Sequence, residues 1–220
     1  MVRPRTRLLS RELIIDTALG LIGSHHDFTI TGLAKTLSVN PSSLYHHFGG
    51  GKEEIIDALR ERIYKSSRFP DFDDNSNSWN SALASWIRSS RESFAEVPAA
   101  IPLLLGRVVD DSPTLHAYEK LASILTEAGV PSSRQIEVIT LIDAIVLGSA
   151  IDSFSPNPLW KENISDTPHL HRAIMSSTAT SRVHAGLEMG ILAITAFVEV
   201  LAQPARLSSA ASSNRVVPAE

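Results

Sequence analysis

Cysteine is absent from this chain of 220 residues, so disulfide bonds, thiol catalysis and zinc held by thiolates are excluded. A chain without cysteine suits a reducing compartment, and we expect a cytoplasmic protein. No segment is a continuous apolar run long enough to span a bilayer, and the basic N-terminus lacks the apolar stretch of a signal peptide. We therefore expect no membrane partner.

The period-two alternation that marks β-strands is almost missing, so we expect no sheet. The motifs of common enzymes are missing as well. No Gly-x-Ser-x-Gly occurs, and the Gly-Gly-Gly-Lys run at 49–52 lacks the strand and the spacing of a phosphate-binding loop. His46 and His47 would point about 100° apart on a helix, which disfavours joint chelation of a metal. We expect no catalytic residue, no metal and no cofactor.

Charge is unevenly distributed along the chain. The formal net charge is −4, yet residues 1–52 carry a balance of +3, so the remainder carries −7. A basic head on an acidic body is typical of a protein whose one end meets phosphate. Arg3, Arg5, Arg7 and Arg11 form a basic N-terminal arm, which either contacts phosphates or the minor groove or serves only as a solubilising tail.

Apolar residues recur at helical spacing along most of the chain, which predicts an all-α fold. Caps and helix breakers mark where each helix begins and ends. The expected helices cover residues 10–23, 29–37, 40–48, 52–65, 79–96, 99–109, 112–128, 132–154, 168–175 and 181–202.

The stretch from Thr29 to Lys52 carries the most specific signal. Two short helices are joined by a tight turn at 38–40, and small Ala34 stands where they would cross, which indicates a helix-turn-helix. Asn40 is a good N-cap, and the proline after it suits the first helical position. The second helix of such a motif enters the major groove, where serine hydroxyls can hydrogen-bond to base edges. The alternative is a set of three ordinary packed helices.

This stretch resembles the TetR family of transcriptional regulators, closely over residues 10–65 and only in architecture beyond them. Many members of that family place two residues between the aromatic residue and the following lysine, whereas three glycines stand here. The shared features are a threonine-rich entry before Leu33-Ala34, Val39 in the turn, the run Leu44-Tyr45-His46-His47-Phe48, and Lys52 at the start of the fourth helix.

The resemblance implies roles for individual residues. The positions of Thr31, Ser42, Ser43 and His46 commonly face bases, and those of Tyr45 and Lys52 commonly face phosphates. The implied partner is double-stranded palindromic operator DNA, read by a homodimer with two heads. The full set of predicted DNA contacts is Thr29, Thr31, Asn40, Pro41, Ser42, Ser43, Tyr45, His46 and Lys52.

The C-terminal part is larger than a dimer clamp requires, so we expect it to bind a small-molecule effector. Asp143 stands in a mostly apolar stretch, where it either provides a polar handle in a cavity or has a protein partner. The tetracycline repressors use histidine to help hold a magnesium–drug complex, but the comparable stretch 97–106 has none. The predicted ligand contacts are Trp86, Phe94, Arg107, His116 and Asp143, of which the aromatic residues could instead be core.

The helices at 132–154 and 181–202 are too apolar to face water on more than one side, and the resemblance places the dimer on the last long helices. Gly186 and Gly190 lie one helical turn apart, which would let another helix approach closely. That helix belongs either to a second copy or to the same subunit.

These observations predict an N-terminal three-helix helix-turn-helix domain and a larger C-terminal helical domain for ligand binding and dimerisation. The expected function is a transcriptional regulator, a repressor released from its operator by a small molecule. The competing readings are an enzyme and a helical adaptor that dimerises without binding DNA. The expected organisation is a flexible arm over 1–9, a DNA-binding domain with a connecting helix over 10–65, a regulatory and dimerisation domain over 66–203, and a disordered tail over 204–220.

Overall fold

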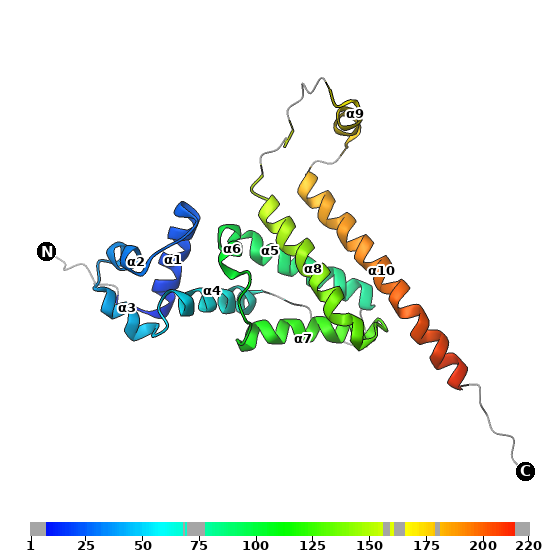
Figure 1. Cartoon of the computed structure of the whole chain (residues 1–220), viewed down its shortest axis with the longest axis horizontal. Helices are drawn as coiled ribbons and strands as arrows, with labels where there is room; N and C mark the ends of the chain where they lie inside the picture. Colours follow the sequence, from blue (N-terminus) through cyan, green and yellow to red (C-terminus); the bar gives the residue numbers. More distant parts are fainter. Residues whose placement is uncertain are drawn as a thin grey trace, which may run out of the picture. The chain divides into compact units, whose positions relative to one another are not determined.

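The computed structural model of the chain describes residues 8–67, 69, 78–155, 159–160, 166–178 and 181–213, with side chains as far as residue 202. Within these ranges the chain forms helices and no strand, which confirms the predicted all-α fold (Figure 1). The helices are α1 (Arg11–His25), α2 (Ile30–Leu37), α3 (Pro41–His47), α4 (Lys52–Ser66), α5 (Trp79–Ala95), the 3-10 helix η1 (Pro98–Ala100), α6 (Ile101–Leu104), α7 (Ser112–Glu127), α8 (Ser132–Asp152), α9 (Pro168–Ser176) and α10 (Arg182–Ser213).

The chain divides into two compact units. The first comprises Met1–Arg68 and Glu96–Tyr118, and the second comprises Phe69–Ala95 and Glu119–Glu220. The first break lies close to the predicted boundary at residue 65, but Glu96–Tyr118 groups with the N-terminal helices. The reason is packing: η1 packs against α1, α6 packs against α4, and Ala100 is buried in the core of the N-terminal helices.

Helices α1 to α4 form around a single core in the first unit. Its fully buried members include Ile14, Leu33, Leu44 and Ile55, one from each of α1 to α4. Side chains cap three helix starts, that of Asn40 as predicted, and each accepts a hydrogen bond from a backbone N–H. Ser10 accepts from Leu13 at 3.2 Å, Thr29 accepts from Gly32 at 3.0 Å, and Asn40 accepts from Ser42 at 3.5 Å.

The second unit is built on α5, α8 and α10, which pack against one another. Trp86 of α5 is fully buried, and its ring stacks on Phe69 with centroids 5.3 Å apart. Two ion pairs join the helices at their polar edges. Arg88 of α5 binds both carboxylate oxygens of Glu188 on α10, and Arg182 of α10 binds those of Asp152 at the end of α8.

Helix α10 differs from its prediction in two respects. It continues past Pro204 to Ser213, where the sequence suggested a disordered tail. Among the described residues its segment Arg182–Ala202 is also apolar and long enough, by composition, to cross a membrane, which the sequence analysis did not anticipate. This segment packs on α5 and α8 through one buried face and pairs Glu188 with α5, while most of its other residues are exposed.

The close packing expected of Gly190 occurs within one subunit. A Cβ built on Gly190 would lie 3.1 Å from Cγ2 of Ile145 on α8, whereas one on Gly186 would meet nothing within 4 Å. The glycine therefore permits α10 to approach α8 of the same chain, and its replacement would disturb the subunit itself. The segment 99–109 also forms less helix than expected, because Gly106 adopts a left-handed conformation with φ 72° soon after α6 ends.

Candidate nucleic-acid interface

The helix-turn-helix consists of α2, the turn at Ser38 and α3. Ser38 adopts a left-handed conformation with φ 56°, and its N–H and that of Val39 close the turn onto the carbonyls of Lys35 and Ala34. Leu33 and Ala34 face the core. The opposite faces of α2 and α3 are therefore left free of the core.

The predicted DNA-contacting residues lie in or beside α2 and α3 and at the start of α4. Thr31, Ser42, Ser43 and His46 make no side-chain hydrogen bond to the part of the chain that is described, so the fold itself does not employ their polar groups. Thr29 and Asn40 serve as helix caps. Within the set, Thr29, Thr31, Asn40, Ser42, Tyr45 and His46 are exposed, and Pro41, Ser43 and Lys52 are half-buried.

The packing of Tyr45 requires a glycine at position 51, one of the three glycines after α3. Its side chain is 50% exposed, and its ring lies against the backbone of Gly51, where an added Cβ would come within 3.1 Å of Cε1. Gly51 also has φ 64° and ψ −132°, a conformation that only glycine adopts readily. The loop that the extra glycine lengthens is therefore closely packed at this position.

Glu54 fixes the same loop from the other side. Its Oε2 accepts a hydrogen bond from the N–H of Gly50 at 2.9 Å, and this bond is the main reason that the pKa of Glu54 is lowered. Gly51 donates to the carbonyl of Phe48 at 2.9 Å. The start of α4, and hence the backbone of Lys52, is held in place despite the three-glycine run.

Lys52 is not a free cation in this structure. Its Nζ lies 2.7 Å from Oδ1 and 2.9 Å from Oδ2 of Asp27, and 5.5 Å from the ring centre of Phe28. The hydrogen bond from Lys52 lowers the pKa of Asp27 below its usual value. The sequence alone does not reveal this partner, because the two residues lie 25 positions apart and no local pattern joins them.

Arg11 belongs to the fold and not to a mobile arm. It lies in α1, with its guanidinium 3.9 Å from the ring centre of Phe48, and it hydrogen-bonds the carbonyl of His47 and a carboxylate oxygen of Glu54. It thereby ties α1 to the end of α3 and the start of α4. Arg3, Arg5 and Arg7 lie outside the described residues.

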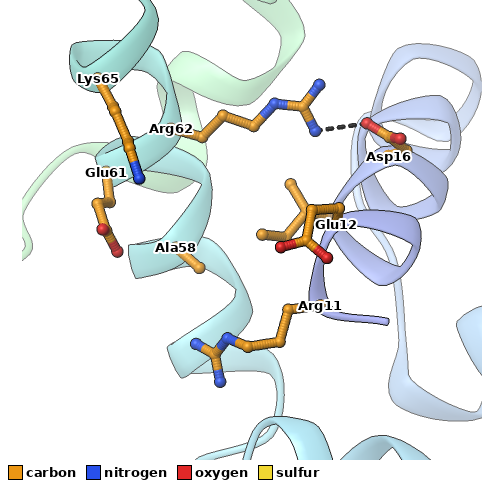
Figure 2. A pocket seen from close by; sticks show the side chains of 8 residues that line it. Arg11, Glu12, Asp16, Ala58, Glu61, Arg62 and Lys65 are labelled. Carbon is orange, nitrogen blue, oxygen red and sulfur yellow. Dashed lines mark hydrogen bonds and ion pairs between the residues drawn. The ribbon is translucent and has the colours of Figure 1, made fainter. Parts of the chain in front are cut away.

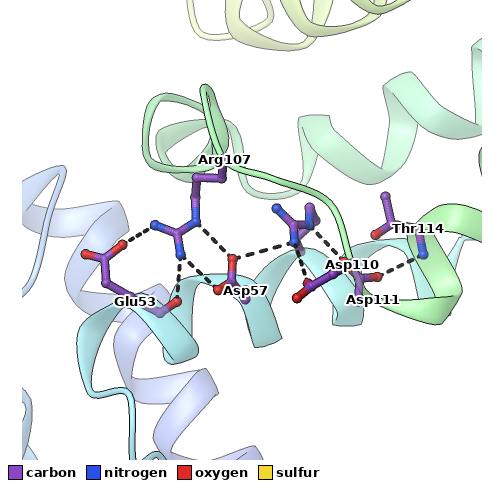
Figure 3. Close-up of polar contacts among 7 residues, drawn as sticks. Glu53, Asp57, Arg107, Asp110, Asp111 and Thr114 are labelled. Carbon is purple, nitrogen blue, oxygen red and sulfur yellow. Dashed lines mark hydrogen bonds and ion pairs between the residues drawn. The ribbon is translucent and has the colours of Figure 1, made fainter.

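A network of ion pairs joins α4 to the segment that follows α6 (Figure 3). Arg107 donates two hydrogen bonds of 2.9 Å to Asp57 and also contacts the carboxylate of Glu53, and these bonds raise the pKa of Arg107 above its ordinary value. Arg107 was predicted to contact a ligand. That role stays a prediction, and in this structure both acidic partners of Arg107 lie on α4 of the first unit.

Arg60 is the buried centre of the same network. Its side chain is only 5% exposed, and its Nε donates to Oδ2 of Asp111 at 2.9 Å. The carboxylate of Asp57 lies 3.5 Å and that of Asp110 3.8 Å from Nη2. Burial raises the pKa of Asp111, but hydrogen bonds from Thr114 and Arg60 outweigh it and hold the pKa below its usual value.

The remaining predicted ligand contacts are divided between the two units. Trp86 and Phe94 are buried in the second unit, and Asp143, also there, is half-buried and has an interaction partner. His116 is exposed on α7 in the first unit. Trp86 and Phe94 are thus buried in the second unit, while Arg107 and His116 belong to the first, and the ligand-binding role of the five residues stays a prediction.

Grooves lined by described residues lie in the first unit. One, of about 410 Å³, runs between α1 and α4 and carries three basic and three acidic side chains, so it has no net charge preference (Figure 2). Arg62 and Asp16 pair across it. The second groove lies beside α2 and is lined by Leu21, His25, Asp27, Phe28, Thr29, Gly32, Lys35 and Thr36. The described residues contain no cluster of histidines and carboxylates that could hold a metal ion.

Comparison with known sequences gives one family. Residues 69–188, more than half of the chain, match the family described as "Tetracyclin repressor-like, C-terminal domain". No curated protein matches the sequence at a significant level.

Solved structures resemble this chain over most of its length. ActR from Streptomyces coelicolor in complex with actinorhodin is 18% identical with a TM-score of 0.71, covering 89% of this chain and 99% of its own. A TetR variant from Acinetobacter baumannii AYE in complex with minocycline is 21% identical with a TM-score of 0.67, covering 88% and 95%. A possible TetR family regulator from Streptomyces coelicolor A3(2) is 18% identical with a TM-score of 0.73, covering 87% and 100%. At these identities the likeness shows the fold.

Proposed function

This chain belongs to the TetR family of transcriptional regulators, and from that premise we propose that it is a sequence-specific DNA-binding repressor that a small molecule releases from its operator. The observation that carries the proposal is the outer surface of the helix-turn-helix. Thr31, Ser42 and His46 are exposed there, and their side chains have no structural hydrogen bond to the described residues. Polar groups that the fold does not use are available to base edges.

Different residues of this surface carry affinity and specificity. Ser42 and Ser43 occupy the first turn of α3, the part of a recognition helix that enters the major groove. Tyr45 lies further along α3, is half exposed and packs against Gly51 before α4, and its phenol is expected to contact a phosphate. Phosphate contacts fix the position of the head, and base contacts select the sequence.

The first test compares Tyr45→Ala with Ser43→Ala. Tyr45→Ala should weaken binding to the operator and to unrelated duplexes by similar factors, because a phosphate contact carries little sequence information. Ser43→Ala should change the preference at one base step by about 1–3 kcal/mol if it contacts a base directly. The operator is obtained by sequencing DNA that co-purifies with the protein, and both variants are titrated on it by fluorescence anisotropy.

Each variant has its own control. Thermal melting should show both variants folded, because neither side chain belongs to the core. Equal operator binding by the full chain and by a chain lacking residues 1–65 would contradict the proposal. A chain that binds no duplex at low salt would contradict it as well.

We propose that two copies form the reading unit. Exposed apolar side chains gather on α8 and α10, the helices predicted to form the dimer: Ile136, Leu141 and Ile151 on α8, and Met189, Leu192, Phe197 and Val200 on α10. A second copy related by two-fold symmetry would cover these faces and supply the second head for a palindromic operator.

The effector is proposed to bind within the second unit and to act by a population shift. ActR and the Acinetobacter TetR variant were each solved with a small molecule, and this chain shares their fold. The protein is expected to exchange between a conformation whose two DNA-binding heads fit the operator and one whose heads are wrongly spaced for it. The loss of DNA affinity cannot exceed the difference in the ligand's affinity for these two conformations. A roughly 100-fold loss of DNA affinity requires about 2.7 kcal/mol of such preference. The site of action would be intracellular, in the cytoplasm.

The second test screens for that effector. A panel of metabolites and drugs is measured by thermal shift on the full chain, and each compound that raises the melting temperature is added to a preformed protein–operator complex. Binding linkage predicts that a true effector raises the melting temperature and lowers operator affinity together. If every stabilising compound leaves operator affinity unchanged, a constitutive DNA-binding protein becomes the better description.

A further inference from the structure

Asp27 lies between α1 and α2, and its carboxylate forms an ion pair with Lys52, the first residue of α4. Both oxygens of its carboxylate are within 2.9 Å of the Nζ of Lys52. The carboxylate is itself fixed, since the backbone N–H of Phe28 donates to Oδ1 at 2.7 Å. Phe28 is buried and its ring lies below the ammonium group at 5.5 Å. The pair is therefore a built contact between two elements of the head.

The pair lies on the surface where DNA contacts are expected. Asp27 lines the groove beside α2 together with Thr29 and Lys35, one a predicted contact and the other an exposed cation. Side chains of Lys52 and Asp27 are 31% and 53% exposed, so a phosphate could reach the ammonium. A phosphate oxygen and a carboxylate oxygen are the same kind of acceptor for it.

We propose that Asp27 is an intramolecular competitor for Lys52, which weakens the hold of the head on any duplex and so limits binding to unrelated sequence. The inference rests on the proposed function, because it requires Lys52 to meet a DNA phosphate. A phosphate that binds Lys52 must either displace the carboxylate or accept a second negative charge roughly 5 Å away. Either event reduces affinity without reference to base sequence.

Stability is a poor alternative explanation for the pair. Both partners are partly exposed, and exposed ion pairs contribute little to folding. The ion pair also changes how DNA binding depends on salt, because Asp27 already neutralises Lys52 before any phosphate does. A lysine already neutralised by a carboxylate releases few of those counterions when it meets a phosphate, whereas an unpaired lysine releases nearly one.

The test is Asp27→Asn in the full chain, titrated by fluorescence anisotropy on an unrelated duplex of about 30 base pairs, between roughly 50 and 200 mM salt. Affinity at the lowest salt should rise about three- to tenfold, because the competing charge is lost. The slope of log K against log salt should steepen by about 0.9, because Lys52 now contributes a full phosphate contact. Operator binding should gain by a similar factor, because a phosphate contact carries no sequence information.

Asp16→Asn is the matched control. Asp16 is a similarly exposed carboxylate on α1 that pairs with Arg62 on α4, so Asp16→Asn also removes one negative charge from an ion pair with α4. Arg62 stands ten residues after Lys52 along α4, about 15 Å further on, which exceeds the Debye length of about 10 Å at 0.1 M salt. The slope of log K against log salt for Asp16→Asn should therefore equal that of the unmodified chain.

A second pair of variants separates competition from simple repulsion. In a Lys52→Ala background, Asp27→Asn should no longer steepen the salt slope, since there is no lysine to release. Equal steepening in both backgrounds would overturn the proposal, and so would unchanged or weaker binding by Asp27→Asn with an unchanged melting temperature. If the unmodified chain and all variants bind neither duplex, the proposed function itself fails and this inference with it.

Discussion

Replacing Asp111 with alanine should lower the free energy of unfolding by about 3 kcal/mol or more, the cost of breaking a buried ion pair. Asp111 is the closest partner of Arg60, whose side chain is 5% exposed. Without that carboxylate the guanidinium would stay in the interior with only the more distant Asp57 and Asp110. The backbone N–H of Thr114, in the first turn of α7, would lose its 2.9 Å hydrogen bond as well.

Asp110→Ala is the matched comparison for this experiment. Asp110 is the adjacent residue with the same charge, but it is 85% exposed and 3.8 Å from Arg60, so its removal should cost less than about 0.5 kcal/mol. Urea denaturation followed by circular dichroism measures both variants. Equal losses for the two would show that the network acts through general charge and not through the buried contact.

The stability of the unmodified chain should also depend on Asp111 in acid. The folded pKa of Asp111 is lowered below its ordinary value, so its contribution is present above the unfolded pKa of about 3.9. That contribution is lost as the pH falls through the lower folded pKa. Below about pH 4 the difference in stability between the unmodified chain and Asp111→Ala should therefore shrink.

Helices α1 to α4 could be predicted from the sequence because the patterns that mark them are local. The caps at Ser10, Thr29 and Asn40 act on backbone groups two or three residues away, and periodicity marks the buried face of each helix. The contacts that fix the loop after α3 could not be predicted. The pairing of Lys52 with Asp27 and the stacking of Arg11 on Phe48 join residues that only the tertiary fold brings together.

The C-terminal part of the chain was predicted less well, because its contacts too join residues that only the tertiary fold brings together. Composition cannot tell whether an aromatic side chain lines a cavity or fills a core, and Trp86 proved fully buried. Nor can it tell which helix a glycine admits, since Gly190 meets Ile145 of its own chain. Arg107 looked free in the sequence because its acidic partners lie about 50 residues earlier, on α4. The apolar character of α8 and α10 was apparent, but not which side of each helix faces outward.

Leu192→Glu should convert the proposed dimer to monomers at micromolar concentration. Leu192 is 65% exposed on α10 and lies between Met189 and Phe197 on one stripe of exposed apolar residues, so its exposure is unexplained in a lone subunit. In a two-fold interface each substitution occurs twice, and it brings two like charges into a contact that excludes water. Two like charges buried together cost several kcal/mol of association free energy, which raises the Kd of the dimer by roughly a thousandfold or more.

Two measurements on Leu192→Glu distinguish lost dimerisation from lost folding. Light scattering gives the mass, and circular dichroism should show unchanged helix content, because the side chain lies outside the core. Operator affinity should fall toward that of a single head on a half-site, while binding to one half-site stays the same. Leu115→Glu, at a 50% exposed position on α7, is the matched control and should remain dimeric. A dimeric Leu192→Glu variant, or an unmodified chain that is monomeric at micromolar concentration, would remove α10 from the interface.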